Sequence, residues 1–158
     1  MPNRFLPQGA DNAYRGNAFA PWLLAIVVLL KAYVGLDCIL NGRFMASAGD
    51  RIPLDSFTAD GARTVVSLLA LWGFSHLLIC GVCLVALARY RTLVPLMFAL
   101  LLLEHLGRML VLHLVPLAQT GPGGESVGVS PVPYGFLVMI GVGLALSLWV
   151  RGDPKGRE

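Results

Sequence analysis

The sequence has very little charge: only 13% of its 158 residues are Asp, Glu, Lys or Arg. Soluble domains average about 25%. A chain with so few charged side chains cannot cover a water-facing surface, and 56% of this one is hydrophobic, with a mean hydropathy of +0.73. The composition therefore excludes an ordinary soluble domain and predicts an integral membrane protein.

Cysteine is also scarce. The three cysteines, Cys38, Cys80 and Cys83, all lie inside hydrophobic runs. Their odd number and apolar surroundings do not fit a disulfide framework. The sequence has no phosphate-binding glycine loop and no His-Glu-x-x-His motif. No catalytic residue can be assigned, and an enzyme is the less favoured class.

The basic residues do not gather in one patch. The net charge is +3 and the pI is near 9.0, but Lys and Arg stand mainly at the ends of hydrophobic runs. Nucleic-acid binding needs a basic face or stripe, so a nucleic-acid partner is excluded. The positions of these residues are better interpreted as signals of membrane topology.

Four hydrophobic stretches approach the length of about 20 residues that a membrane-spanning helix requires. They are residues 19–40, 64–88, 93–117 and 132–150. Backbone groups in hydrocarbon must bond within their own segment, so these stretches are predicted to be helices. We expect an all-α polytopic membrane protein, with an up-down-up-down bundle of four transmembrane helices over residues 19–150.

Orientation follows from the distribution of Lys and Arg. Seven lie in the two tails (residues 1–18 and 151–158) and the second loop, against three in the first loop and none in the third. The positive-inside rule then places both termini in the cytoplasm. We expect a multi-pass protein of a bacterial inner membrane, with the lipid bilayer as its main partner.

The first loop, residues 41–63, contains apolar residues such as Leu54 and Phe57. It is expected to fold back onto the membrane surface as a small cap. Thr58, followed by Asp60 in the first helical turn, is the predicted N-cap of the second span.

Ionisable residues inside the spans are the candidate site. A charge near the middle of a membrane helix costs about 2.5–3.5 kcal/mol, so it must face protein or water and usually has a partner. The candidates for a buried ion pair or ligand site are Lys31, Asp37, His76, Glu104, His105 and Arg108.

Their spacing suggests partners. Glu104 and Arg108 are four residues apart and share a helix face. Lys31 and Glu104 lie at similar depth, which predicts a pair between helices, and Asp37 lies at the depth of Arg108. Gly107 is expected to let another backbone approach closely. Two interpretations remain open: ion pairs that hold helices together, or a site for an anionic or quinone-like head group or a proton.

His76, Cys80 and Cys83 follow one another at i, i+4 and i+7, so they share a helix face. They are weak candidates for a soft-metal site, although cysteine also packs well as a small apolar residue. His76 and His105 could instead bracket a haem. No cofactor is assigned.

The fourth span carries no ionisable residue. Gly141 with Ala145, and Gly143 with Ser147, form small-xxx-small pairs that allow close helix packing. This span is the candidate contact surface for a membrane protein partner or a second copy of the chain.

Four features resemble the DoxX-like group of small bacterial four-helix inner-membrane proteins. They are the polar end of the first helix (residues 35–42), the basic turn Arg89-Tyr90-Arg91, Glu104-x-x-x-Arg108, and the glycine-rich last helix. The resemblance covers residues 19–150 in topology. It implies an accessory role beside quinone or redox chemistry.

Three function classes follow. A non-enzymatic accessory or scaffold subunit of a membrane complex is favoured by the small size and the absence of an assigned catalytic residue. The alternatives are a binder or carrier of a small amphiphile (a quinone, lipid or anion) at the Lys31, Glu104 and Arg108 cluster, and a haem- or quinone-linked redox protein.

Overall fold

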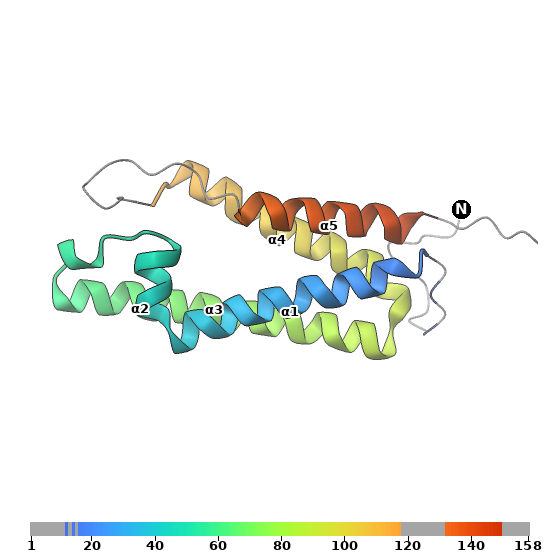
Figure 1. Ribbon diagram of the computed structural model, residues 1–158, viewed down its shortest axis with the longest axis horizontal. Helices are drawn as coiled ribbons and strands as arrows, with labels where there is room; N and C mark the ends of the chain where they lie inside the picture. The colour runs from blue at the N-terminus through green and yellow to red at the C-terminus, as the bar shows by residue number, and fades with distance from the viewer. Residues whose placement is uncertain (1–11, 13, 15, 118–131, 150–158) are drawn as a thin grey trace, which may run out of the picture. The chain divides into compact units, whose positions relative to one another are not determined.

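The computed structural model describes Asn12, Tyr14, residues 16–117 and residues 132–149. All regular structure in these residues is helical (Figure 1). The long helices are α1 (Phe19–Leu40), α3 (Ala59–Arg89), α4 (Val94–Leu114) and α5 (Val132–Leu148). Short helical segments connect them: α2 (Gly42–Phe44), the π-helix η1 (Met45–Gly49), and the 3₁₀-helices η2 (Leu54–Ser56) and η3 (Arg91–Leu93). The predicted all-α class is confirmed.

Three helices, α1, α3 and α4 with η3 before it, are long and apolar enough to cross a membrane. The helix α5 is equally apolar but has only 17 residues. At 1.5 Å per residue it is roughly 25 Å long, a little less than the hydrocarbon thickness of about 30 Å. Length and composition thus establish three candidate spans and one shorter apolar helix.

The helix boundaries follow local chemistry. α1 has the predicted limits, and the side chain of Asn17 accepts a hydrogen bond from the Phe19 amide at 3.0 Å. α3 begins five residues before its predicted start, because Thr58 Oγ1 accepts the Gly61 amide at 3.1 Å and starts the helix there. α4 ends at Leu114, shortly before Pro116.

The chain divides into two compact units. Unit 1 contains the described residues of Met1–Val28, Val82–Leu106 and Val132–Glu158; unit 2 contains those of Leu29–Gly81 and Gly107–Pro131. α1, α3 and α4 contribute residues to both units, whereas α5 belongs to unit 1 and the segments α2, η1 and η2 belong to unit 2.

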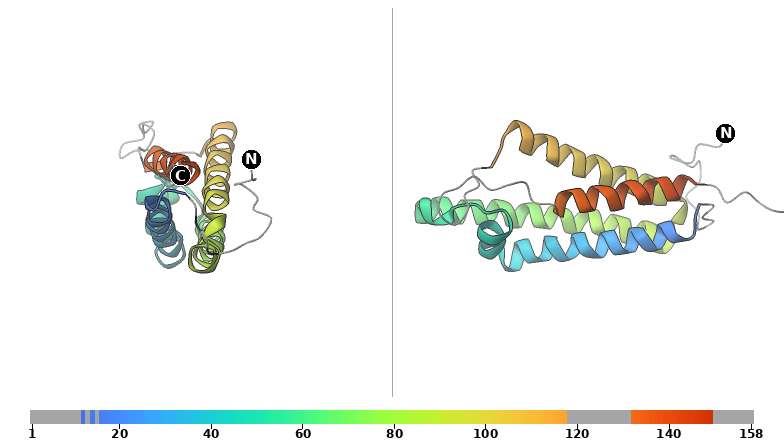
Figure 2. Two further views of the ribbon diagram at one scale, coloured as in Figure 1. Left: turned by 90° about the vertical axis from the view of Figure 1, so that its right-hand side faces the viewer. Right: turned by 45° about the horizontal axis from the view of Figure 1, so that its top comes forward.

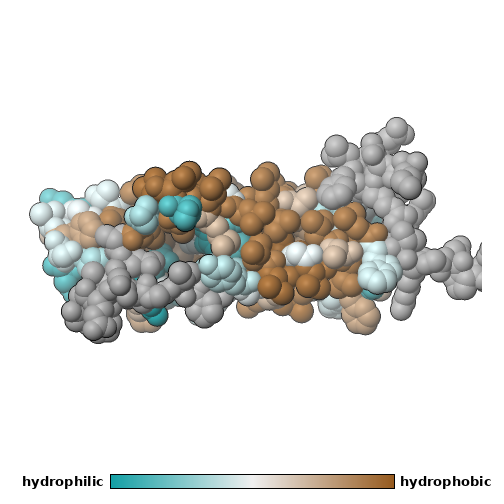
Figure 3. Space-filling model, turned by 90° about the horizontal axis from the view of Figure 1, so that it is seen from above, coloured by the Kyte–Doolittle hydropathy of each residue, from teal (hydrophilic) through white to brown (hydrophobic). Residues whose placement is uncertain are grey.

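In unit 1, α5 lies beside the first half of α4 (Figure 2). A side-chain carbon added at Gly143 would overlap the ring of Phe98, so this glycine lets the ring lie against the α5 backbone. Phe98 and Ile140 are fully buried. The outward face of α5 is largely hydrophobic (Figure 3), with Val138 and Val142 exposed.

In unit 2, the segments α2, η1 and η2 form a cap on α3. Ala46 and Leu54 of the cap are buried together with Ala62 of α3. Partly buried side chains pack around them: Ile52, Val65, Val66 and Leu69. The first loop therefore folds back as a cap, and α3 is the surface it covers. Its expected position on the membrane surface stays a prediction.

Candidate functional site

Lys31 of α1 and His76 of α3 meet inside unit 2. The Lys31 Nζ lies 3.1 Å from His76 Nε2, and the side chains are only 4% and 5% exposed. A lysine ammonium can only donate hydrogen bonds. When Lys31 is charged, His76 Nε2 must therefore accept, and the imidazole is neutral with its proton on Nδ1. This bond was not among the predicted pairs.

Two glycines bring these side chains within reach. A side-chain carbon added at Gly73 would lie 2.5 Å from the Gly35 carbonyl oxygen, and one added at Gly35 would lie 2.9 Å from the Gly73 oxygen. The backbones of α1 and α3 are thus in direct contact one turn from Lys31 and three residues from His76. The close approach expected at Gly107 is wrong, because an added carbon there would meet no atom within 4 Å.

Trp72 extends the cluster from α3 to α4. Its ring centroid lies 4.2 Å from that of His76, with the planes tilted by 52°. The guanidinium of Arg108, in the part of α4 that belongs to unit 2, lies 5.1 Å from the Trp72 centroid in a cation–π contact. Lys31, His76, Trp72 and Arg108, called the α1–α3–α4 cluster below, thus form a chain of contacts across three helices.

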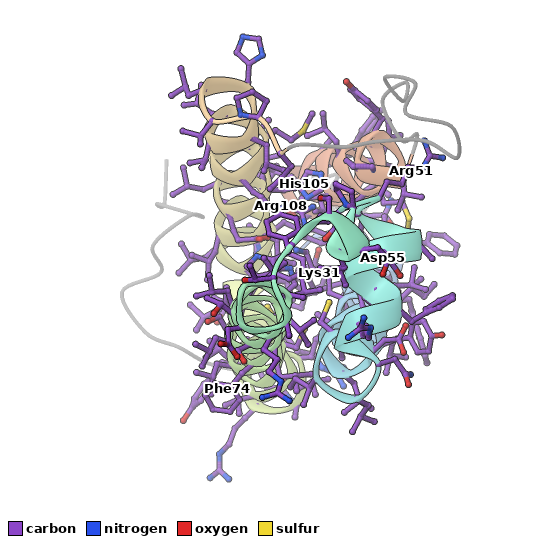
Figure 4. All side chains as sticks on the ribbon, turned by 90° about the vertical axis from the view of Figure 1, so that its left-hand side faces the viewer. Lys31, Arg51, Asp55, Phe74, His105 and Arg108 are labelled. Atoms are coloured by element: carbon purple, nitrogen blue, oxygen red, sulfur yellow. The ribbon has the colours of Figure 1, made fainter. Side chains whose placement is uncertain are left out.

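Trp72 was missed because a tryptophan in a hydrophobic run resembles ordinary packing. Its position four residues before His76 was the available signal, because that spacing places two rings on one helix face. Figure 4 shows Lys31 and Arg108 toward the interior and Phe74 pointing outward.

The cap adds a carboxylate to unit 2. Asp50 follows η1, and its amide closes a π-turn by donating to the Met45 carbonyl at 2.8 Å. The next residue, Arg51, has a φ of 56°, which is uncommon outside glycine. Burial raises the pKa of the Asp50 carboxyl, and the charge of Arg108 partly opposes this shift. Asp50 therefore lies in electrostatic range of the cluster.

Asp37 and Cys38 lie at the end of α1. The Asp37 carboxylate accepts a hydrogen bond from the Asn41 side chain one turn later. Cys38 is buried. Because α1 is helical over both residues, the spacing of six between Lys31 and Asp37 puts them on different faces, and Lys31 is buried whereas Asp37 is partly buried.

His105 has a different role, in unit 1. Its side chain is fully buried, and Nε2 lies 2.8 Å from the Pro133 carbonyl oxygen in the first turn of α5. A carbonyl only accepts, so His105 Nε2 donates. His105 thus links α4 to α5.

The haem alternative needs a ring nitrogen with a free lone pair on each histidine. His76 Nε2 is bonded to Lys31, and His105 Nε2 is bonded to the Pro133 carbonyl. These bonds engage one ring nitrogen of each histidine, and the haem alternative stays a prediction.

Glu104 lies one helical turn before Arg108 on α4, and its side chain is partly buried. It has an interaction partner, as do Lys31 and Arg108. The pair of Lys31 with Glu104 stays a prediction.

No group of three or more His, Cys, Asp and Glu residues in the described part of the chain could hold a metal ion. His76, Cys80 and Cys83 lie on one helix, α3, and a soft-metal site there stays a prediction. All three cysteines are buried.

The sequence also contains two short patterns. Cys80-Gly81-Val82-Cys83 has Cys-x-x-Cys spacing on α3, and Gly124-Glu-Ser-Val-Gly128 matches Gly-x-Ser-x-Gly. The latter lies outside the described residues. It signals a nucleophile only between a strand and a helix, and the described residues include no strand.

Comparison with known proteins adds no relative. No family model, no curated protein and no solved structure matches the chain. The resemblance to DoxX-like proteins accordingly has no support beyond the sequence features named above.

Proposed function

We propose that this chain is a four-span protein of a bacterial-type inner membrane that serves as a non-enzymatic accessory or scaffold subunit of a membrane complex. Its candidate spans present large hydrophobic side chains on their outer faces: Trp22 is 74% exposed, Leu29 64% and Leu103 70%. Soluble monomers rarely expose apolar surface on this scale, and a lipid environment accounts for it.

A contact in unit 1 supports an even number of membrane crossings by the chain. The Asn17 amide, just before α1, donates to the Leu146 carbonyl near the end of α5 at 3.4 Å. The start of the first helix and the end of the last therefore lie together, as they do when both termini are on one side of a membrane. The excess of Lys and Arg in the tails and second loop supports a cytoplasmic location for that side.

The observation that carries the accessory role is the use of buried polar side chains as links between helices. Lys31 to His76 joins α1 and α3, and His105 to Pro133 joins α4 and α5. Bonds of this kind contribute about 0.6–2 kcal/mol each in membrane proteins. Polar groups that bond between helices stabilise the arrangement of the helices, which is what a scaffold subunit requires.

The structure separates the two small-residue faces of α5. Gly143 and Ser147 are buried within unit 1, so they are not available to a partner. Gly141 has open space around it, and Ala145 is exposed. A contact with a membrane protein or a second copy through α5 would therefore use Gly141 and Ala145.

Native mass spectrometry of protein extracted gently from its own membrane tests this role. The proposal expects the chain in a complex of fixed stoichiometry, and it expects Gly141→Leu to lose the partner without losing its own thermal stability. Gly143→Leu is the matched variant, because it should unfold the chain itself. A wild-type chain that is released bare and monomeric would contradict the accessory role.

A further inference from the structure

The turn between α3 and α4 is basic and exposed. Arg89 is the last residue of α3 and Arg91 the first of η3, and both are exposed on either side of the partly buried Tyr90. From this turn and the charges around it we propose that Arg89 and Arg91 bind the phosphate of an anionic phospholipid at the membrane surface. This contact rests on the proposed location in a membrane and does not depend on the accessory role.

The chain itself orients one of the two guanidinium groups. Arg91 Nε donates to the Leu87 carbonyl oxygen in the last turn of α3 at 3.2 Å. The end of a helix leaves such carbonyls without an intrahelical partner, so the bond also caps α3. It uses only Nε, and the two terminal nitrogens keep the fork of donors that matches phosphate oxygens. A side chain that is already restrained has a smaller ordering cost on binding.

The charge of the turn has little compensation in the described part of unit 1. The only other residue of the Asp, Glu, Lys and Arg group there is Glu104, which lies ten residues into α4, roughly 15 Å along the helix. Glu104 also has an interaction partner of its own. Within the chain, the turn is therefore a site of net positive charge.

The first loop, which belongs to unit 2, differs in this respect. Its three arginines are accompanied by three aspartates, and the two sets are Arg43, Arg51 and Arg63, and Asp50, Asp55 and Asp60. An anionic lipid gains little from a segment whose charges balance, because exposed charges are also screened by salt over about 10 Å. The turn is thus the more attractive of the two segments for an anion, and the first loop offers matched control residues.

Exposed aromatic residues indicate that this end of unit 1 lies at the level of the lipid head groups. Phe19 and Trp22 near the start of α1 are 69% and 74% exposed, and Trp149, which follows α5, is 66% exposed. The start of α1, the end of α5 and the turn between α3 and α4 lie at one end of the unit (Figure 1). Tryptophan is enriched where hydrocarbon meets head groups, and that is the level at which lipid phosphates lie.

The net charge of the head group should decide which lipid binds. A basic residue at an anionic membrane surface raises affinity roughly fivefold, the equivalent of about 1 kcal/mol. A zwitterionic phospholipid carries the same phosphate with a cation beside it, so it gains less from the two arginines. After screening by salt, the pair should favour an anionic over a zwitterionic lipid by at least about fivefold.

Native mass spectrometry of the full chain in a mild detergent provides the assay. The protein is titrated with palmitoyl-oleoyl phosphatidylglycerol and with the phosphatidylcholine that has the same chains. We expect Kd for the first bound phosphatidylglycerol to be at least about fivefold lower, and this preference to decline as the salt concentration rises. Inorganic phosphate at matched ionic strength should not displace the lipid, because it has no acyl chains to place against the apolar surface.

Variants decide whether the turn is responsible. Arg89→Gln with Arg91→Gln should reduce the preference to about twofold or less. Arg89→Lys with Arg91→Lys keeps both charges and loses only the guanidinium geometry, so it should keep most of the preference. Arg43→Gln removes an exposed arginine from the first loop and should leave the preference unchanged.

The proposal is overturned by equal affinity for the two lipids, by displacement of the lipid by inorganic phosphate, or by a glutamine double variant that prefers phosphatidylglycerol as strongly as the wild type. A lysine double variant that loses the preference as fully as the glutamine variant would also overturn it. A monomeric chain that still prefers phosphatidylglycerol would contradict the accessory role while supporting the lipid contact. A stable complex without the preference would do the reverse.

Discussion

Replacing Gly73 with alanine would place a methyl group where the backbones of α1 and α3 already touch. The new carbon would lie 2.5 Å from the Gly35 carbonyl oxygen and 2.8 Å from Cys38 Cβ. Neither neighbour is the flexible end of a side chain, so the helices must separate. Overpacking of this kind costs about 1–3 kcal/mol, and separation would also stretch the Lys31–His76 bond, which is now 3.1 Å long.

Gly81 provides a matched control on the same helix. An added carbon there would meet no atom within 4 Å, and alanine is favoured over glycine in a helix interior by up to about 1 kcal/mol. Gly81→Ala should therefore be neutral or stabilising.

The free energies of unfolding of both variants can be measured by titration with sodium dodecyl sulfate, followed by circular dichroism. We expect a difference of about 1–3 kcal/mol between them, because both variants gain the helix propensity of alanine and only Gly73→Ala is overpacked. Equal stability of Gly73→Ala and Gly81→Ala would refute the close crossing of α1 and α3.

Three further changes test other contacts. Gly143→Ala should destabilise the chain by about 1–3 kcal/mol through overlap with Phe98, whereas Gly141→Ala should not, in the same unfolding assay. His105→Phe should cost about 0.6–2 kcal/mol through loss of the bond to the Pro133 carbonyl, and His105→Gln should cost less if its amide reaches the same oxygen. Burial raises the pKa of Asp50 above its ordinary value of 3.8, so the folded state holds this proton more tightly than the unfolded state. The contribution of Asp50 to stability should therefore fall as the pH rises from its ordinary pKa to its raised pKa in the folded state. Asp50→Asn should flatten the pH dependence of the free energy of unfolding. A steeper dependence in the variant would contradict this sign.

The helices were largely predictable from the sequence because their limits have local causes. Asn17 precedes α1, and Asn41-Gly42 follows it, so hydropathy and helix signals give the same limits. α3 begins earlier than hydropathy alone indicates, because its first turn is polar and lies before the apolar stretch. The Thr58 cap, identified in advance, marks the true start.

The partners within the cluster were less predictable. Spacing and depth identified Lys31, His76 and Arg108 as buried polar residues. Which of them meet depends on how α1 and α3 cross, and that is set by Gly35 and Gly73. Eighteen glycines occur in the sequence, and no local rule distinguishes the two at the crossing from Gly81 or Gly107.

The small residues of α5 illustrate the same limit. The sequence gives two equivalent faces, Gly141 with Ala145 and Gly143 with Ser147. Only the position of Phe98 on α4 decides which face is used inside the chain. Helix periodicity predicts that faces exist, and tertiary packing selects between them.

A double-mutant cycle between Lys31→Met and His76→Leu tests most directly whether buried polar side chains hold the helices together. Unfolding free energies of the wild type, both single variants and the double variant isolate the interaction between the two residues. The bond observed at 3.1 Å predicts a coupling of about 0.6–1.7 kcal/mol. Effects that add to within about 0.3 kcal/mol would show that Lys31 and His76 do not stabilise each other, and would contradict the account.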